Sequence, residues 1–333
     1  MNTLSFLRYA YGAAYGRFWN NLKAVAAREN RSAAGLGLDF LGCFARYGCG
    51  LSDYLNYELW NKTASQRKEY VTIKDMDAFY ERVSPSAYKT FFTIKPNFLV
   101  NFAPYINRAF FVPEPDNLPA LEAYLRDKTE VMVKPVDGLG GQGVHKVKTA
   151  EIGDLAVYHR ELLSGNLFLE DVILQHPDLV ALCPASVNTI RVMTVQAGDR
   201  AELLFACLRV GAGADVDNFH AGGMAVEVDL DTGKLMGNAV NKSCQEFTRH
   251  PVTNVKFNHF IIPMWEEVKR VCLTASRVNP HIHVVGWDVA VTPEGPTFVE
   301  GNRRPGFDLP QMTGRRGRRD IIRRVDALLK EEG

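Results

Sequence analysis

The stretch Val284–Gly306, VVGWDVAVTPEGPTFVEGNRRPG, has two short apolar runs around the turn sequence TPEGP, which predicts a β-hairpin. Asp288 lies on the first strand, and Glu300 and Asn302 end the second. Residues two apart on a strand share a face, so Glu300 and Asn302 point the same way. If Asp288 faces them, three oxygen ligands converge on a site that suits Mg²⁺ between carboxylates and phosphates. An ordinary polar strand end before a turn is the alternative interpretation.

A glycine-rich stretch far upstream, EVMVKPVDGLGGQGVHKV at 130–147, predicts a strand, a loop and a second strand. Glycines let backbone amides approach phosphate oxygens closely, and Lys134 adds a point charge. A dinucleotide-binding fold needs a helix after such a loop, a Walker loop needs Gly-Lys-Ser/Thr, and a protein kinase carries its lysine after the loop. The remaining interpretation is a flap over phosphates, formed by Gly138, Gly140, Gly141, Gln142 and Gly143.

Further short motifs follow these two stretches along the chain. They are Lys134-Pro135, Asn188-Thr189-Ile190-Arg191, Asn218-Phe219-His220-Ala221-Gly222-Gly223, Asp288, Glu300-Gly301-Asn302 and Pro305-Gly306. In this order they resemble the ATP-grasp superfamily, and most closely the sugar-transfer-associated ATP-grasp group found among bacterial envelope and polysaccharide genes. The resemblance covers roughly residues 50–315 and is specific only as a combination.

This resemblance implies the fold class and its division. We expect an α+β ATP-grasp fold, in which two α+β subdomains clasp ATP and Mg²⁺, with a helical N-terminal region. The expected parts are residues 1–90 as the helical region, 91–117 as a linker, 118–175 as a lid with the glycine-rich flap, and 176–333 as the C-terminal subdomain with the metal site.

The resemblance also implies where the adenine and phosphates bind. The strand and hinge at 167–175, LFLEDVILQ, would hold the adenine. Glu170 would accept a hydrogen bond from the exocyclic amine, and backbone groups of Asp171, Val172 and Ile173 would meet the ring edge. A solvated strand-end charge is the alternative for Glu170. Lys95 would reach the phosphates, but its context Thr-Ile-Lys-Pro departs from the expected Asp-Lys, so a surface lysine is the alternative.

One arginine stands among apolar residues in the alternating strand SVNTIRVMT at 186–194. Such an arginine needs a partner. A γ-phosphate or acyl phosphate would bind Arg191 bidentately, and a structural salt bridge is the alternative. The resemblance places Asn188 and Arg191 at the nucleotide and gives Arg191 and Lys134 catalytic roles.

The acceptor substrate is expected near two polar segments. Asn218, His220 and Gly222 lie in the loop DNFHAGGM, where His220 could accept a proton or serve only as a hydrogen-bonding group. Arg303 and Arg304 follow the predicted metal ligands and could bind a carboxylate or diphosphate. The arginines after them, up to position 324, could form a solvated helix face.

Composition narrows the class of protein. The net charge of +1 gives no overall drive toward nucleic acid or membrane. The six scattered cysteines read as thiols in a reducing compartment, and the chain shows neither a long apolar run nor a signal peptide. We therefore expect a cytoplasmic protein. The aromatic N-terminal 30 residues could pack on their own domain or contact a membrane surface or partner.

The predicted function is an ATP-dependent carboxylate–amine ligase that forms an amide through an acyl phosphate and releases ADP and phosphate. Its substrates would be an amino acid, a carboxylated sugar or a peptide-like metabolite. Two alternatives remain open at the level of sequence. The first is a kinase of a sugar or other hydroxyl on the same fold, and the second is a non-catalytic nucleotide-binding protein of a polysaccharide pathway. The sequence does not indicate the oligomeric state.

Overall fold

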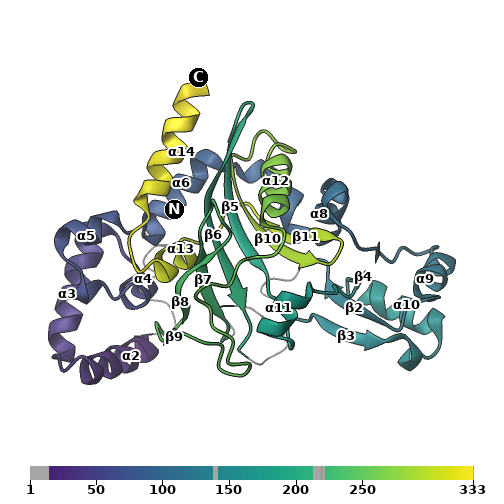
Figure 1. Ribbon diagram of the computed structural model, residues 1–333, viewed down its shortest axis with the longest axis horizontal. Helices are drawn as coiled ribbons and strands as arrows, with labels where there is room; N and C mark the ends of the chain where they lie inside the picture. Colours follow the sequence, from purple (N-terminus) through teal and green to yellow (C-terminus); the bar gives the residue numbers. More distant parts are fainter. Residues whose placement is uncertain (1–14, 138–141, 213–218, 220–221, 333) are drawn as a thin grey trace.

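The computed structural model describes residues 15–137, 142–212, 219 and 222–332. Figure 1 shows a central sheet with a helical region at one end and a smaller sheet at the other. Within the described residues, the central sheet has seven antiparallel strands in the order β11-β10-β5-β6-β7-β8-β9. Their bounds are β5 Ile190–Ala197, β6 Arg200–Val210, β7 Met224–Val228, β8 Leu235–Asn241, β9 Glu246–Phe247, β10 Val284–Thr292 and β11 Gly295–Asn302. The helices on this sheet are α12 Trp265–Ala275, α13 Asp308–Thr313 and α14 Arg319–Glu332.

The central sheet separates two hydrophobic cores, because alternate residues of a strand point to opposite faces. Met193 and Val195 of β5 pack with buried residues of α13 and α14. Ile190 and Val192 of the same strand pack with buried residues of α12. Since both faces are covered, all the residues of β10 are buried. The predicted hairpin is confirmed, and it lies at the edge of this sheet as β10 and β11.

In the described part of the chain, the smaller sheet has four strands in the order β1-β4-β2-β3. Its elements are β1 Phe110–Phe111, β2 Glu130–Pro135, β3 His145–Lys148 and β4 Leu167–Asp171, with α9 Leu118–Leu125, α10 Leu155–Ser164 and the 3-10 turn η4 Thr149–Glu151. Leu121 and Leu162 of the helices pack on Val131, Val133 and Leu169 of the strands in a third core. The predicted strands on either side of the glycine-rich loop are therefore present as β2 and β3.

The N-terminal region is helical, as predicted, and lies at the opposite end of the molecule from the smaller sheet (Figure 1). It comprises α2 Tyr15–Arg28, α3 Ala33–Tyr47, α4 Leu51–Asn56, η1 Leu59–Asn61, α5 Ala64–Glu69 and α6 Ile73–Val83. Residues 1–14 of the predicted aromatic helix lie outside the described residues. All six cysteines are unpaired, and only Cys244 is not fully buried.

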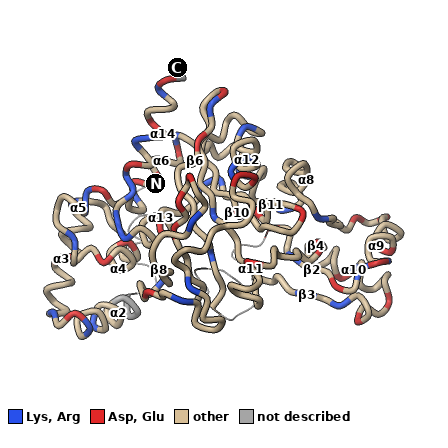
Figure 2. The backbone as a smooth tube through the Cα atoms, in the orientation of Figure 1, with Lys and Arg blue, Asp and Glu red and all other residues tan. Residues whose placement is uncertain are grey.

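The arginines near the C-terminus bind acidic residues of other elements. Arg319 lies 2.6 Å from Asp75 of α6, and Arg323 lies 2.8 Å from Glu69 of α5. Figure 2 shows basic and acidic residues side by side where α14 meets these helices. Exposed pairs of this kind are screened by solvent and contribute little to stability, so they orient α14 more than they stabilise it. Among the described residues, no helix is long and apolar enough to span a bilayer.

A connecting segment of short helices joins the helical region to the smaller sheet. It consists of η2 Ser86–Tyr88, α7 Thr90–Thr93, α8 Lys95–Asn101 and η3 Ala103–Tyr105. Phe98 and Phe102 of this segment pack on Trp287 and Phe298 of the β10–β11 hairpin. The segment therefore runs along the predicted metal hairpin before the chain enters β1.

Candidate functional site

The β10–β11 hairpin brings the two predicted carboxylate ligands together. Asp288 is paired in register with Glu300 on one side and with Arg191 of β5 on the other. Asn302 Nδ2 donates to Glu300 at 3.3 Å. All three predicted metal ligands therefore lie together at one end of the hairpin.

Two arginines hold Asp288 from the sheet side. Arg191 donates from Nε at 2.5 Å to one carboxylate oxygen and from Nη2 at 2.9 Å to the other. Arg209 of β6 donates from Nη1 at 2.7 Å. Burial opposes ionisation of Asp288, but these two guanidinium groups hold its pKa well below its usual range. Asp288 is therefore a fixed anion.

Arg191 has the structural salt bridge that the sequence left open as the alternative to a phosphate contact. The neighbouring Gly286 of β10 makes room for Pro305, since a Cβ at Gly286 would lie 2.6 Å from Pro305 Cβ. Because its bidentate bond is already made to Asp288, Arg191 acts on the site chiefly by fixing that carboxylate. A phosphate contact would have to share this guanidinium with Asp288.

Glu300 titrates in the opposite sense to Asp288. Burial and the negative charge of Asp288 both raise the pKa of Glu300, although Arg191 and Asn302 oppose this. Two adjacent carboxylates with an amide oxygen beside them match the hard oxygen ligands that Mg²⁺ prefers, and a cation would relieve their repulsion. Among the described residues, no group of three or more His, Cys, Asp or Glu side chains could hold a metal ion. Mg²⁺ would therefore complete its coordination with phosphate oxygens or water.

A second buried carboxylate lies on the smaller sheet. Glu170 of β4 is 2% exposed, and Lys134 Nζ of β2 lies 2.5 Å from its Oε2. Arg108 donates to both oxygens, from Nε at 3.2 Å and from Nη2 at 3.3 Å. Burial alone would raise the pKa of Glu170, but Lys134 and Arg108 lower it below its ordinary value. Glu170 is thus a buried, ionised acceptor and not a solvated strand end.

Lys95 lies between these two carboxylate clusters. Its Nζ donates to Pro135 O at 3.0 Å, and its backbone N–H donates to Val136 O at 2.9 Å. Burial lowers the pKa of Lys95, with Lys134 adding to the effect and Glu300 opposing it. Lys95 therefore sits at the start of α8 as a half-buried cation, in contrast to the exposed surface lysine considered as the alternative.

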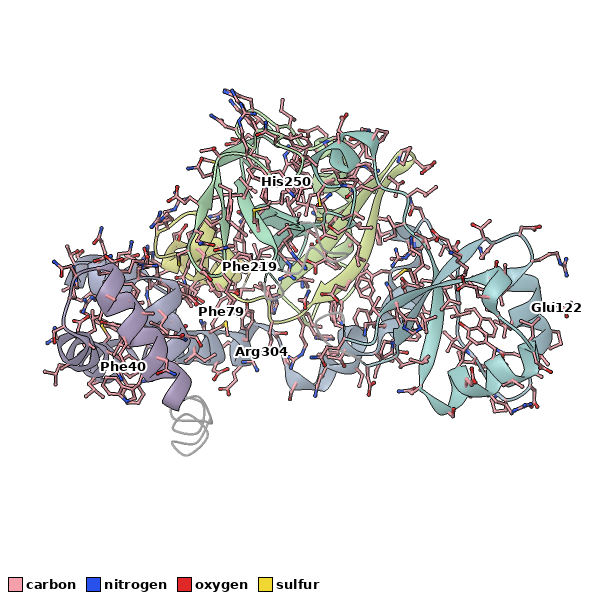
Figure 3. The ribbon with its side chains drawn as sticks, turned by 90° about the horizontal axis from the view of Figure 1, so that it is seen from below. Phe40, Phe79, Glu122, Phe219, His250 and Arg304 are labelled. Atoms are coloured by element: carbon pink, nitrogen blue, oxygen red, sulfur yellow. The ribbon has the colours of Figure 1, made fainter. Side chains whose placement is uncertain are left out.

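A cavity of about 210 Å³ opens beside these groups. It is walled on one side by the apolar side chains of α7 and α8 and on the other by the end of β11. Its polar lining residues are Thr93, Lys95, Glu170, Glu300, Asn302, Arg303 and Arg304. Figure 3 shows Arg304 between Phe40 of the N-terminal helices and Glu122 of α9, on the side nearer Phe40. The cavity thus joins six of the residues predicted from sequence: Lys95, Glu170, Glu300, Asn302, Arg303 and Arg304.

The two arginines after the metal ligands are anchored on the helical region. Arg303 Nη1 donates to Ser84 O at 2.8 Å. Arg304 lies 3.3 Å from Asp77 of α6 and covers the ring of Tyr80. The helical region, which carries none of the sequence motifs, therefore forms part of the cavity wall indirectly by holding these side chains.

Two other residues predicted for the nucleotide site, Asn188 and Asp171, do not line this cavity. Asn188 is fully buried, precedes β5, and donates from Nδ2 at 3.0 Å to the carbonyls of Leu179 and Cys183, at the end of α11 (Pro177–Leu182). In this structure Asn188 anchors α11 through Nδ2, while its buried Oδ1 has no hydrogen-bond partner among the described residues. The side chain of Asp171 is bound to Lys128, Tyr124 and Ala109 N, and its backbone N–H donates to Ala109 O at 3.0 Å.

Part of the predicted flap and acceptor loop is described. Gln142 and Gly143 are exposed, and a Cβ at Gly143 would lie 2.9 Å from Pro135 Cγ, so the loop returns close over the end of β2. Val172 and Ile173 follow β4 and are half-buried. Gly222 is exposed and has a φ of +100°, which favours glycine. Gly138, Gly140, Gly141, Asn218 and His220 lie outside the described residues.

Two residues of the site, Arg108 and Arg209, were not predicted from the sequence. Both stand beside apolar runs, in NRAFFV and LLFACLRVG. The argument applied to Arg191, that an arginine among apolar neighbours needs a partner, applies to them equally. Their partners lie 62 and 79 residues away along the chain, so no local motif reveals the pairs.

Comparisons with solved structures found several ATP-grasp ligases. The ligase PsnB in complex with a minimal precursor shares 15% identity over 75% of this chain, with a TM-score of 0.43. This chain spans 64% of the PsnB chain. D-cycloserine synthetase DcsG shares 14% identity over 78% of this chain and 79% of its own, with a TM-score of 0.44. The D-alanine–D-alanine ligase from Coxiella burnetii shares 13% identity over 73% of this chain and 60% of its own, with a TM-score of 0.41.

Sequence comparison points to one family. A search of curated proteins found no match. The model of the sugar-transfer-associated ATP-grasp family matches residues 59–327, which include both sheets, the cavity and helix α6, which holds Arg304. The chain belongs to the sugar-transfer-associated ATP-grasp family.

Proposed function

We propose that this protein is an ATP-dependent ligase that joins a carboxylate to an amine and releases ADP and phosphate. The observation that carries the proposal is the cavity, in which Glu300 and Asn302 face cationic Lys95, Arg303 and Arg304. Membership of the ATP-grasp family supports ATP as the co-substrate. In this proposal, residues 118–175 act as the lid and residues 176–333 carry the metal site.

Each end of the proposed ATP site has its own carboxylate. At the base end, Glu170 would accept a hydrogen bond from the exocyclic amine of adenine. At the phosphate end, Lys95 and Lys134 would neutralise phosphate oxygens, while Arg191 and Arg209 hold Asp288 in place. Mg²⁺ held by Asp288, Glu300 and Asn302 would offset the charge on the phosphates during transfer.

The proposed chemistry needs positioning and charge neutralisation more than covalent help from the protein. A substrate carboxylate oxygen attacks the γ-phosphorus, the bond to ADP breaks, and an acyl phosphate forms. The amine nitrogen then attacks the acyl carbon, phosphate leaves with the C–O electron pair, and the amine loses a proton, for which His220 is the proposed acceptor. Arg303 and Arg304 would bind the carboxylate substrate, and the loop 138–143 would exclude water.

The proposed substrates are an amino acid, a carboxylated sugar or a peptide-like metabolite, and the family name supports a polysaccharide setting. We place the reaction in the cytoplasm, because six unpaired thiols suit a reducing compartment and the reaction needs ATP.

Nucleotide release tests the proposal. The purified protein with ATP and Mg²⁺ is incubated with amino acids and uronic acids, singly and in pairs, while ADP, AMP and phosphate are followed. ADP and phosphate that appear only with a carboxylate and an amine together would establish the ligase. AMP release would contradict an acyl phosphate. A stable phosphorylated product would identify a kinase, and ATP binding without turnover would indicate a binding protein.

A further inference from the structure

Arg108 connects the two sheets on either side of the cavity. Its side chain is 4% exposed. Besides its two bonds to Glu170 of β4, it donates from Nη1 at 2.7 Å to Phe298 O and at 3.2 Å to Thr297 Oγ1, both on β11. One guanidinium group therefore ties the strand that carries the proposed base acceptor to the strand that carries the proposed metal ligands.

The neighbours of Arg108 fix its backbone from both sides. Asn107 donates from its backbone N–H to Thr297 Oγ1 at 3.2 Å and from Nδ2 to Thr292 Oγ1 at 3.0 Å, which docks it on the hairpin. Ala109 exchanges hydrogen bonds with Asp171, which docks it on β4. The segment is therefore held to each sheet by a separate residue, and Arg108 can be altered without removing either anchor.

Arg108 also neutralises the charge of Glu170. Lys134 and Arg108 both neutralise Glu170 in this structure. Under the proposed function Lys134 also serves the ATP phosphates, which would draw its single ammonium away from Glu170. The Arg108 guanidinium cannot move away in the same way, because it is hydrogen-bonded both to Glu170 of β4 and to Thr297 and Phe298 of β11. It would then be the cation that keeps Glu170 ionised and aimed at the base.

We propose that Arg108 sets the base specificity of the nucleotide site by holding Glu170 as an acceptor for the exocyclic amine of adenine. The inference rests on the proposed ATP-dependent function and adds a positioning residue to it. Inosine triphosphate, which has a carbonyl where ATP has its amine, would place an acceptor against the fixed carboxylate and bind more weakly.

Nucleotide binding by equilibrium dialysis, with ATP and with ITP, tests the role without relying on turnover. Wild type should prefer ATP at least tenfold. Arg108→Gln, which removes the charge, should lower that preference by roughly tenfold, and Glu170→Gln should do the same. Arg108→Lys keeps the charge but loses the two-pronged hydrogen bonding of the guanidinium group. It should therefore lower the preference for ATP less than Arg108→Gln does.

Asn107→Ala is the matched control, because it removes a bond to the hairpin from the adjacent residue and leaves Glu170 untouched. It should lower the melting temperature and leave the ATP:ITP ratio unchanged. An unchanged ratio in Arg108→Gln, or an equal fall in Asn107→Ala, would overturn the inference. If Arg108→Gln does not fold, Arg108→Lys decides by the same ratio. Failure of wild type to bind ATP would instead refute the proposed function, and the inference with it.

Discussion

Asp288 and Glu300 are paired in register across the β10–β11 hairpin, although both are carboxylic acids. Opposed like charges destabilise a strand pair, and here two arginines hold Asp288 ionised while burial and the charge of Asp288 raise the pKa of Glu300. A cation bound between the two carboxyl groups would relieve the same repulsion. The pair is thus suited to exchange any proton on Glu300 for Mg²⁺.

Replacing Glu300 tests the metal assignment. Glu300→Gln keeps the size and hydrogen-bonding ability of the side chain but loses its charge. We expect ATP turnover to fall at least about a hundredfold, because the charge that offsets the phosphates would no longer be held. The melting temperature should stay the same or rise, because the repulsion with Asp288 is removed. Glu294→Gln, on the exposed turn of the same hairpin, should change neither quantity. Near-wild-type turnover in Glu300→Gln would rule out Glu300 as a metal ligand.

The Asp288–Glu300 pair also predicts how the stabilisation of the folded protein by Mg²⁺ depends on pH. The folded protein with a raised Glu300 pKa keeps a proton that the unfolded chain releases, so this group's contribution to stability falls as pH rises past its ordinary value. Mg²⁺ with ADP should remove that loss. We expect the increase in melting temperature on adding Mg²⁺ and ADP to be larger at pH 8 than at pH 5.5. Glu300→Gln should show no such difference, and an increase that is independent of pH in wild type would contradict the exchange.

Lys134 and Lys146 on neighbouring strands form a matched test of the nucleotide site. Lys134 contacts buried Glu170, whereas Lys146 of β3 pairs with Glu130 at the surface, 3.1 Å away. Lys134→Met should weaken ATP binding by roughly tenfold or more, since a charge-assisted contact is worth about 1.5–3 kcal/mol. Lys146→Met should leave ATP affinity within error of wild type. Equal affinities for both variants, measured by calorimetric titration, would remove Lys134 from the site.

The sequence predicted those parts of the site whose signals are local. The hairpin is recognisable from two apolar runs around a turn, and the two-residue spacing of Glu300 and Asn302 puts them together whatever the rest of the fold does. Lys134 could be placed at the end of β2 because a short apolar run precedes it and a glycine-rich loop follows it. The family resemblance then supplied the pairing of these distant segments.

What escaped prediction depends on contacts between segments far apart in the chain. Arg108 and Arg209 find their partners only once the sheets have formed. The bond of Asn188 to α11 also escaped prediction, because the alternating pattern extends upstream of the strand, which begins at Ile190, and a tertiary contact turns the side chain toward α11. The support that Ser84 and Asp77 give to Arg303 and Arg304 comes from a region without motifs, so no local pattern indicates it.

The helical region offers a test of stability that is independent of catalysis. Asp53, in the first turn of α4, accepts hydrogen bonds from Gly50 N at 2.8 Å and Ile73 N at 3.0 Å. Burial nevertheless raises the pKa of Asp53 to about 6. Between pH 4 and pH 6 the folded protein therefore keeps a proton that the unfolded chain loses, and stability falls as pH rises through that interval.

Asp53→Asn removes this titration. Both backbone bonds end on the same carboxylate oxygen, Oδ2, so an asparagine Oδ1 in that place can accept both. The variant should gain stability relative to wild type as pH rises from 4.5 to 7.5, by roughly 2 kcal/mol at the upper end. Urea unfolding at both pH values measures the difference. Ser52→Ala, the neighbouring exposed position, is the control, because serine does not titrate and its effect should be equal at both. A difference between Asp53→Asn and wild type that stays constant with pH would show that Asp53 is ionised throughout and that its hydrogen bonds outweigh its burial.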